Sequence, residues 1–398
     1  MRSRHLFGQA MGLVALLIAV GCDFALDPED VEDVSVQCER GPAELKRGDT
    51  FKVVVWNLQF GAGRKHQFFY DGGDAVRVPE ADTEAAVAEI AQALKDIGAD
   101  IALLQEVDRG SDRTQQTDQL MAYLDASEPA CWASTPYHQV AYLPYPGPTF
   151  LGKVDMHLST LSRFQIATSK RHQLALLDEP GWRQAMNLKR AILETTVPLA
   201  DGGELRLGNT HLSAFSGGDG TLEKQVAQLD DWMGHGALFV LGGDFNMLPP
   251  GDDPSRLTTE RDLYADDVNP IEAILPERSI ATADPLDKFA RTYLPFGEDV
   301  PDRKIDYVVL GDDLEVLSAR VLGRYRHLSD HLPILVEFRI RSGEEPELED
   351  DADEEPPAGA RPRIDGAPGA DGKRGKGKGK AGKMKGKVPR GGAKGDPG

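Results

Sequence analysis

Lys52-Val53-Val54-Val55-Trp56-Asn57 is the stretch of sequence that decides the fold. Three consecutive valines favour a β-strand, because branched side chains pack well on a pleated surface. The run ends on a polar residue, Asn57, directly after Trp56. We therefore expect a strand that begins near residue 51 and presents a polar side chain at its carboxyl end.

Short apolar runs of the same kind recur along the chain and predict further strands. They lie at residues 101–104, 191–197, 205–207, 238–241, 305–310 and 333–338. Apolar residues at helical spacing occur at 83–97 and 221–233. Many strands with few helices between them predict an α/β domain in which sheets pack on one another and helices cover the outside.

Four long stretches without clear periodicity separate these elements and are expected to be irregular. They are residues 61–80, 131–153, 176–189 and 248–303. Long loops of this kind often form the rims of functional sites. The first of them mixes basic and aromatic residues, which suits either contact with a substrate or packing of the loop on the core.

The two ends of the chain differ in composition from its middle. Basic residues precede an apolar run at 10–20 that is too short to span a bilayer, which predicts an export signal over 1–22. The end of this run resembles a bacterial lipobox, in which Cys22 is acylated; a plain cleaved signal is the alternative. We expect a polar tether at 23–48, one folded domain at 49–341 and an acidic, then Gly/Lys-rich, disordered tail at 342–398.

The charge of the chain bears on the partners that it can bind. Lys and Arg number 45 against 65 Asp and Glu, a formal net charge of -20, and the acidity belongs to the folded part. Affinity for long nucleic acids comes from basic residues that displace counterions, so this balance disfavours long duplex DNA. The basic tail has the charge to contact polyanions, although a solvated tail is the simpler interpretation.

Cys38 and Cys131 remain as a pair if Cys22 carries lipid. An exported protein meets an oxidising environment in which disulfides persist. A bridge between them requires their Cα atoms to lie within about 7 Å. The sequence leaves a disulfide and two free thiols equally open.

Polar residues stand repeatedly where the apolar runs end. The segments are Trp56-Asn57, Leu104-Gln105-Glu106, Asn209-Thr210-His211-Leu212, Gly243-Asp244-Phe245-Asn246, Ile305-Asp306-Tyr307 and Ser329-Asp330-His331-Leu332-Pro333. Each one alone is commonplace as a turn or a solvated cap. Together they supply two histidines, four carboxylates and three asparagines, and metal-assisted hydrolysis requires residues of these kinds.

With these motifs in this order, the sequence resembles the endonuclease/exonuclease/phosphatase family from about residue 51 to 339. The resemblance implies a sandwich of two mixed sheets flanked by helices, in four layers. It also implies hydrolysis of phosphate esters, most often diesters, with Mg²⁺ or Mn²⁺.

The resemblance assigns a role to each polar residue. Glu106, Asn57 and Asp330 are the expected metal ligands. His331 is the expected base, with Asp306 fixing its tautomer. Asp244 and Asn246 are expected to orient the water or protonate the leaving oxygen, and His211 to donate to the phosphoryl oxygens.

Four arginines are candidates for binding the substrate phosphate. Arg163 and Arg190 lie in segments that resemble the family's serine-arginine and arginine-alanine segments, and an ordinary salt bridge is the alternative for both. Arg109 and Arg113 follow Glu106 in a short loop. The expected substrate is a nucleic acid or a lipid headgroup; a small-molecule phosphatase and a non-catalytic envelope binding protein are the alternatives.

Overall fold

The computed structural model describes residues 24–282 and 284–342. The predicted signal, Cys22 and all but the first residue of the predicted tail lie outside these ranges. None of the helices in them combines the length and the apolar character needed to cross a bilayer.

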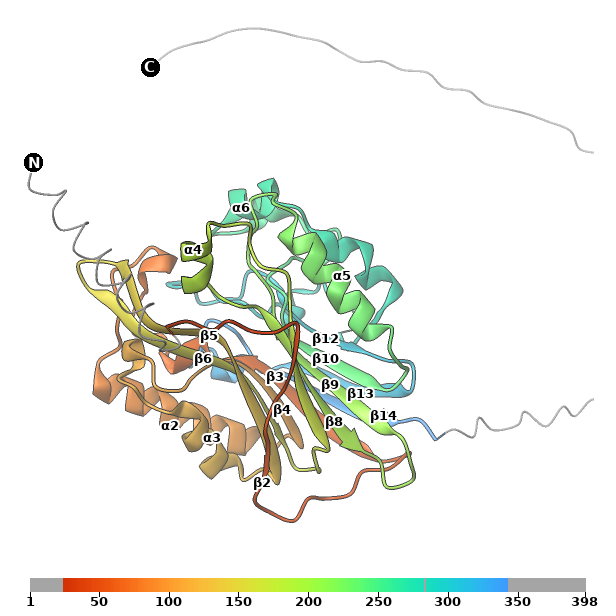
Figure 1. Cartoon of the computed structure of the whole chain (residues 1–398). Helices are drawn as coiled ribbons and strands as arrows, with labels where there is room; N and C mark the ends of the chain where they lie inside the picture. Colours follow the sequence, from red (N-terminus) through yellow and green to blue (C-terminus); the bar gives the residue numbers. More distant parts are fainter. Residues whose placement is uncertain (1–23, 283, 343–398) are drawn as a thin grey trace, which may run out of the picture. The chain divides into compact units, whose positions relative to one another are not determined.

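Two seven-stranded sheets form the centre of the domain (Figure 1). The first has the order β13-β14-β3-β4-β6-β5-β2, with β13 at Leu314–Val321, β14 at Ile334–Ile340, β3 at Thr50–Asn57, β4 at Ile101–Asp108, β6 at Phe150–Ser162, β5 at Cys131–Pro146 and β2 at Val36–Cys38. The second has the order β1-β7-β8-β9-β10-β12-β11, with β1 at Val31–Asp33, β7 at Thr168–Gln173, β8 at Ala191–Pro198, β9 at Glu204–His211, β10 at Phe239–Asp244, β12 at Asp306–Leu310 and β11 at Ser279–Ile280. Both sheets are mixed, because β3 pairs with β4, and β9 with β10, in parallel.

The core lies between the two sheets and is built from alternate residues of their central strands. Val53 and Val55 of β3 and Leu103 of β4 pack there against Leu207 and Val240 of the opposite sheet. All five are buried. The valine run thus provides one face of the main core, as strand periodicity requires.

Helices cover the outer faces of both sheets, completing the predicted four layers (Figure 1). The helices are α2 at Glu80–Ile97, α3 at Gln119–Ser127, α4 at Gly181–Met186, α5 at Thr221–Met233 and α6 at Arg261–Asp266. The first sheet's outer face packs on α2 and α3, and the second's packs on α5. Val54, which lies between Val53 and Val55 in β3, faces the opposite way and packs with Ile90 and Leu94 of α2.

The segment predicted as a tether belongs in part to the domain. Its Val31–Asp33 pairs with β7 and its Val36–Cys38 pairs with β5, one strand at the edge of each sheet. Cys38 and Cys131 stand opposite each other in that pairing and form a disulfide, with Cα atoms 4.1 Å apart. The boundary expected at residue 49 is therefore wrong, because short edge strands carry little hydrophobic signal of their own.

The stretch at 131–153, expected to be irregular, forms most of a long hairpin from β5 and β6. The sequence analysis missed this hairpin because of the prolines at 136, 144 and 146, since proline within a run argues against a strand. The pairing register shifts near Pro136 and Pro146, which is how the hairpin accommodates them.

Candidate active site

The predicted polar residues meet at one end of the sandwich because of how the central strands pair. Asn57 ends β3, His211 ends β9 and Asp244 ends β10. Asp244 lies in register with His211 on one side and with Asp306, the first residue of β12, on the other. Parallel pairing places the carboxyl ends of strands at the same edge, so residues far apart in sequence face one site.

Two of these residues adopt a backbone conformation that side chains rarely take. Glu106 has φ of 57° and lies where the β4–β6 register shifts between Leu104 and Val107. Asn246 has φ of 55° directly after β10. Such strain costs of order 1–3 kcal/mol and concentrates at functional sites, where the surrounding structure holds it in place.

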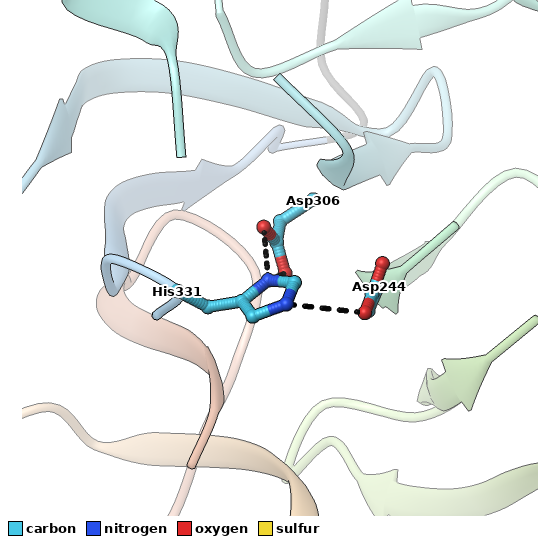
Figure 2. A group of neighbouring side chains, drawn as sticks. All are labelled: Asp244, Asp306 and His331. Carbon is cyan, nitrogen blue, oxygen red and sulfur yellow. Dashed lines mark hydrogen bonds and ion pairs between the residues drawn. The ribbon is translucent and has the colours of Figure 1, made fainter. Parts of the chain in front are cut away.

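His331 is hydrogen-bonded to Asp306 at the centre of the site (Figure 2). Its Nδ1 lies 2.8 and 3.0 Å from the two carboxylate oxygens of Asp306, and its Nε2 lies 3.5 Å from Asp244. Asp244, Asp306 and His331 are buried, and their donor atoms lie within 4.8 Å of one another. Holding Nδ1 in this way fixes the ring and leaves Nε2 to face the space beside Asp244.

The two histidines of the site have opposite electrostatic surroundings. Burial alone lowers the pKa of His331, but Asp306, Asp244 and Asp330 together raise it well above its ordinary value. Burial lowers the pKa of His211 well below its ordinary value, and the charges of Arg190 and His331 lower it further. One imidazole is therefore stabilised as a cation and the other as the neutral ring.

The site contains carboxylates that repel one another, of which Asp244 and Asp306 are buried and Glu106 and Asp330 are half-buried. Burial raises the pKa of Glu106, and the charge of Asp330 raises it further, while Arg113 and His331 oppose the rise. A divalent cation relieves this repulsion, and carboxylate oxygens are the ligands that hard cations prefer. The donor set of Glu106 and Asp330 therefore fits such a cation.

Asn57 takes part in this cluster as a donor. Its Nδ2 donates to Glu106 at 3.2 Å and to Asp244 at 3.1 Å, while its Oδ1 accepts from the backbone N–H of Gln59. In this geometry the amide holds the two carboxylates in position. Oδ1 keeps a second lone pair, so the role of Asn57 as a metal ligand stays a prediction.

Each of the two arginines after Glu106 is bound to a carboxylate of the protein. Arg113 is buried and gives two hydrogen bonds to the fully buried Asp108. Arg109 is bound in the same bidentate way by Asp118, at 2.9 and 3.1 Å. Their predicted role as phosphate ligands is not supported, because each guanidinium already has its carboxylate.

Arg163 and Arg190 separate clearly in the structure. Arg163 follows Ser162, which pairs with Ile101 at the start of β4, and it bridges to Asp100 at 2.9 Å. This is the end of the strand away from Glu106, so Arg163 forms an ordinary salt bridge and its predicted role in binding is wrong. Arg190 instead lies near the charges of Glu106 and Asp244, and its Nη1 is buried without a hydrogen-bond partner among the described residues.

One residue of the site escaped the sequence analysis. The fully buried Tyr137 of β5 places its hydroxyl 3.0 Å from Nδ1 of His211, whose Nε2 lies 3.3 Å from Asp244. The guanidinium of Arg190 lies 5.8 Å from the Tyr137 ring centroid. No motif marks this tyrosine, and it falls in a stretch that was expected to be irregular.

The basic and aromatic loop at 61–80 is largely packed. Phe68 is buried and stacks on the ring of Tyr70 at 5.4 Å, while Lys65 and His66 both bind Asp82. Tyr70 is 47% exposed and is the aromatic residue of this loop that remains available at the rim. Packing rather than substrate contact therefore explains most of the loop's composition.

Comparison with known proteins agrees with the fold and gives the family of the chain. The model of the endonuclease/exonuclease/phosphatase family matches residues 54–331, and the chain belongs to this family. It is a phosphoesterase of a superfamily that depends on divalent metals. None of the curated proteins compared with the chain matches it.

Solved structures to which the chain is similar come from several organisms. A protein of this family from Beutenbergia cavernae is 22% identical, with 73% of this chain and 72% of that one covered and a TM-score of 0.53. A mannosyl-6-phosphatase from Bacteroides thetaiotaomicron is 17% identical, with 72% and 99% covered and a TM-score of 0.45. Truncated TDP2 from Caenorhabditis elegans is 16% identical, with 74% and 98% covered and a TM-score of 0.43. The likeness to the Beutenbergia cavernae protein supports the fold.

Proposed function

We propose that this protein is an exported, Mg²⁺- or Mn²⁺-dependent phosphodiesterase in which His331 acts as the general base. The observation that carries the proposal is the buried His331–Asp306 pair, with Nε2 of His331 directed toward Asp244. Placed beside Glu106 and Asp330, this pair has the arrangement that activates water next to a metal-bound phosphate.

The roles of the residues follow from their contacts. In its neutral form His331 takes the proton of the attacking water at Nε2, and Asp306 stabilises the imidazolium that results. The carboxylates raise the pKa of His331, and a cation held by Glu106 and Asp330 would favour the neutral ring by offsetting their charge. Neutral His211 and the unpartnered Nη1 of Arg190 provide donors for the phosphoryl oxygens as negative charge builds on them. Glu106 and Asp330 would hold the divalent cation, which would supply positive charge to the phosphoryl oxygens.

The proton for the leaving oxygen has a candidate source in Asp244. Burial raises the pKa of this carboxyl, the charge of His331 opposes the rise, and Asp306 adds to it. The backbone N–H of Asn246 and the amide of Asn57 fix its orientation. Attack by water in line with the leaving group needs no covalent intermediate.

An extracytoplasmic address is part of the proposal. The export signal at 1–22 with acylation of Cys22 places the enzyme at a membrane surface facing outward. The Cys38–Cys131 disulfide supports an oxidising compartment, because such bonds rarely persist in the cytosol. Among diesters, the acidic composition favours a lipid headgroup or other small diester over long duplex DNA. The basic tail is proposed to contact polyanions.

The test is hydrolysis by the chain from Asp23 onward, with Mg²⁺, with Mn²⁺ and with a chelator. Substrates are bis-p-nitrophenyl phosphate, sphingomyelin vesicles, duplex and single-stranded DNA, and RNA. We expect metal-dependent turnover that is lost in His331→Ala. Equal turnover in the variant, or none on any substrate, would refute the catalytic proposal and favour a small-molecule phosphatase or a binding protein.

A further inference from the structure

A cavity of about 290 Å³ opens beside the active site between the segments that follow β9 and β10. Ala214 and Phe215 line it after His211, and Asn246, Met247 and Leu248 line it after Asp244. Residues between 252 and 272 complete its walls. Pockets that hold a whole ligand measure about 300–1,000 Å³, so this cavity is large enough for only a part of a ligand.

Asn246 connects the cavity to the reacting centre. Its backbone N–H donates to Asp244 and its side-chain amide donates to the carbonyl of Leu212, so it is held between the two catalytic strands. The same residue forms part of the cavity wall. A phosphate bound next to Asp244 and His331 can therefore extend its organic group into this opening.

The cavity walls combine aromatic rings with acceptors. Phe215 and Tyr264 meet edge to face, with ring centroids 5.0 Å apart. Asp252, Asp267 and Glu272 add carboxylates, and no lysine or arginine stands among the described residues that line the cavity. Among the lining residues themselves, a second phosphate group would meet carboxylates and no positive charge, with Asp252 partly neutralised by Arg256.

The acceptors in the cavity wall differ in how many hydrogen bonds they already receive from other groups of the protein. Asp252 is bound by Arg256, and Asp267 accepts from the backbone N–H groups of Ser216 and Gly217. Glu272 is exposed and receives only a 3.4 Å contact from Asn269. Oδ1 of Asn269 is buried and lacks a partner among the described residues.

We propose that this cavity is the subsite for the organic group of the substrate, an alcohol portion that carries hydroxyl or ammonium donors and no second phosphate. The inference rests on the proposed phosphodiesterase activity and narrows its substrate to small diesters with a neutral or cationic headgroup. Donors on that group bind Glu272 and Asn269, and its carbon skeleton packs on Phe215 and Tyr264.

The test compares four diesters on the chain from Asp23 onward with Mg²⁺. Glycerophosphoethanolamine offers ammonium, glycerophosphoinositol offers hydroxyls, a 5′-phosphorylated thymidine dinucleotide offers a second phosphate, and bis-p-nitrophenyl phosphate is the reference. Glu272→Lys reverses the charge at the cavity. Glu84→Lys, on an exposed position of α2 against the other sheet, makes the same change of net charge elsewhere.

Glu272→Lys is expected to lower kcat/KM on glycerophosphoethanolamine at least tenfold, mainly through KM, and to raise it on the dinucleotide. Turnover of bis-p-nitrophenyl phosphate should stay within twofold, and Glu84→Lys should leave all four unchanged. Identical profiles for the two variants, or preference of the unaltered protein for the dinucleotide, would overturn the subsite.

Binding without catalysis separates this inference from the proposed function. Saturation-transfer NMR in chelator should detect ethanolamine or myo-inositol on the unaltered protein, and Val268→Trp, which fills the cavity from a 42% exposed position, should abolish the signal. Binding without hydrolysis of any diester refutes the phosphodiesterase and keeps the subsite. Hydrolysis without binding of either probe refutes the subsite alone.

Discussion

Asp306 holds both of its carboxylate oxygens within 3.0 Å of Nδ1 of His331. Asp306→Asn keeps the size of the side chain but removes the charge that stabilises the imidazolium and presents an amide N–H to the ring. We expect kcat to fall by about 10²–10⁴ with little change in KM, in the range of a lost general base. Steady-state kinetics with bis-p-nitrophenyl phosphate measure this. A loss smaller than threefold would remove the pair from the mechanism.

Glu106 is a carboxylate of the site whose negative charge is repelled by that of Asp330. Glu106→Gln removes the repulsion, so the metal-free protein should unfold at a higher temperature than the unaltered one. The rise in Tm that Mg²⁺ or Mn²⁺ gives the unaltered protein should shrink in the variant, because a ligand is lost. Calorimetry with and without chelator checks both effects, and Glu84→Gln is the surface control. An undiminished metal response would exclude Glu106 as a ligand.

At the scale of the strand, the position of an arginine along its element decides what it can do. Arg163 lies beyond Ser162, at the end of β6 where β4 begins, whereas Arg190 precedes β8 and lies near the charges of Glu106 and Asp244. Arg163→Ala should keep kcat/KM within twofold. Arg190→Ala should reduce it at least tenfold, because a donor to the phosphate is removed. Equal effects of the two substitutions would contradict this assignment.

Glu194 joins β8 to β9 and α5 through Arg206 and Trp232. Burial raises its pKa, but hydrogen bonds from His172, Arg206 and Trp232 lower it to about 2. Because the folded state lowers the pKa of Glu194, this group stabilises the folded state at pH values above its ordinary pKa of 4.5. The contribution is lost as the pH falls from 4.5 toward 2. We expect a loss of about 2 kcal/mol over that window. Urea unfolding at several pH values should show a flatter profile in Glu194→Gln.

At the scale of the whole domain, the Cys38–Cys131 bridge closes a segment with a sequence separation of 93 residues and fixes β2 to the edge of its sheet. Cross-links over long segments stabilise mainly by restricting the unfolded chain. The double substitution Cys38→Ser/Cys131→Ser should lower the free energy of unfolding by about 3 kcal/mol. Reductant should lower the Tm of the unaltered protein and leave the variant unchanged. A reductant effect on the variant would point to another cause.

The sequence determined the central strands and the motifs at their ends. Valine-rich and leucine-rich runs such as 52–56 and 238–241 are strands because they must bury both faces, one in the core and one under a helix. Helices α2 and α5 followed from their apolar spacing in the same way. These features depend on local hydrophobicity, which a sequence displays directly.

The tertiary structure alone decided the edges and the partners. Strands β1, β2 and β5 are short or interrupted by proline, so only pairing with neighbours makes them strands. The four arginines look alike in sequence, yet three are paired with nearby carboxylates. Of the four, Arg190 is the one with a buried guanidinium nitrogen that lacks a hydrogen-bond partner among the described residues. Tyr137 joins His211 for the same reason. Contacts between distant residues depend on strand order and register, and no local pattern encodes these.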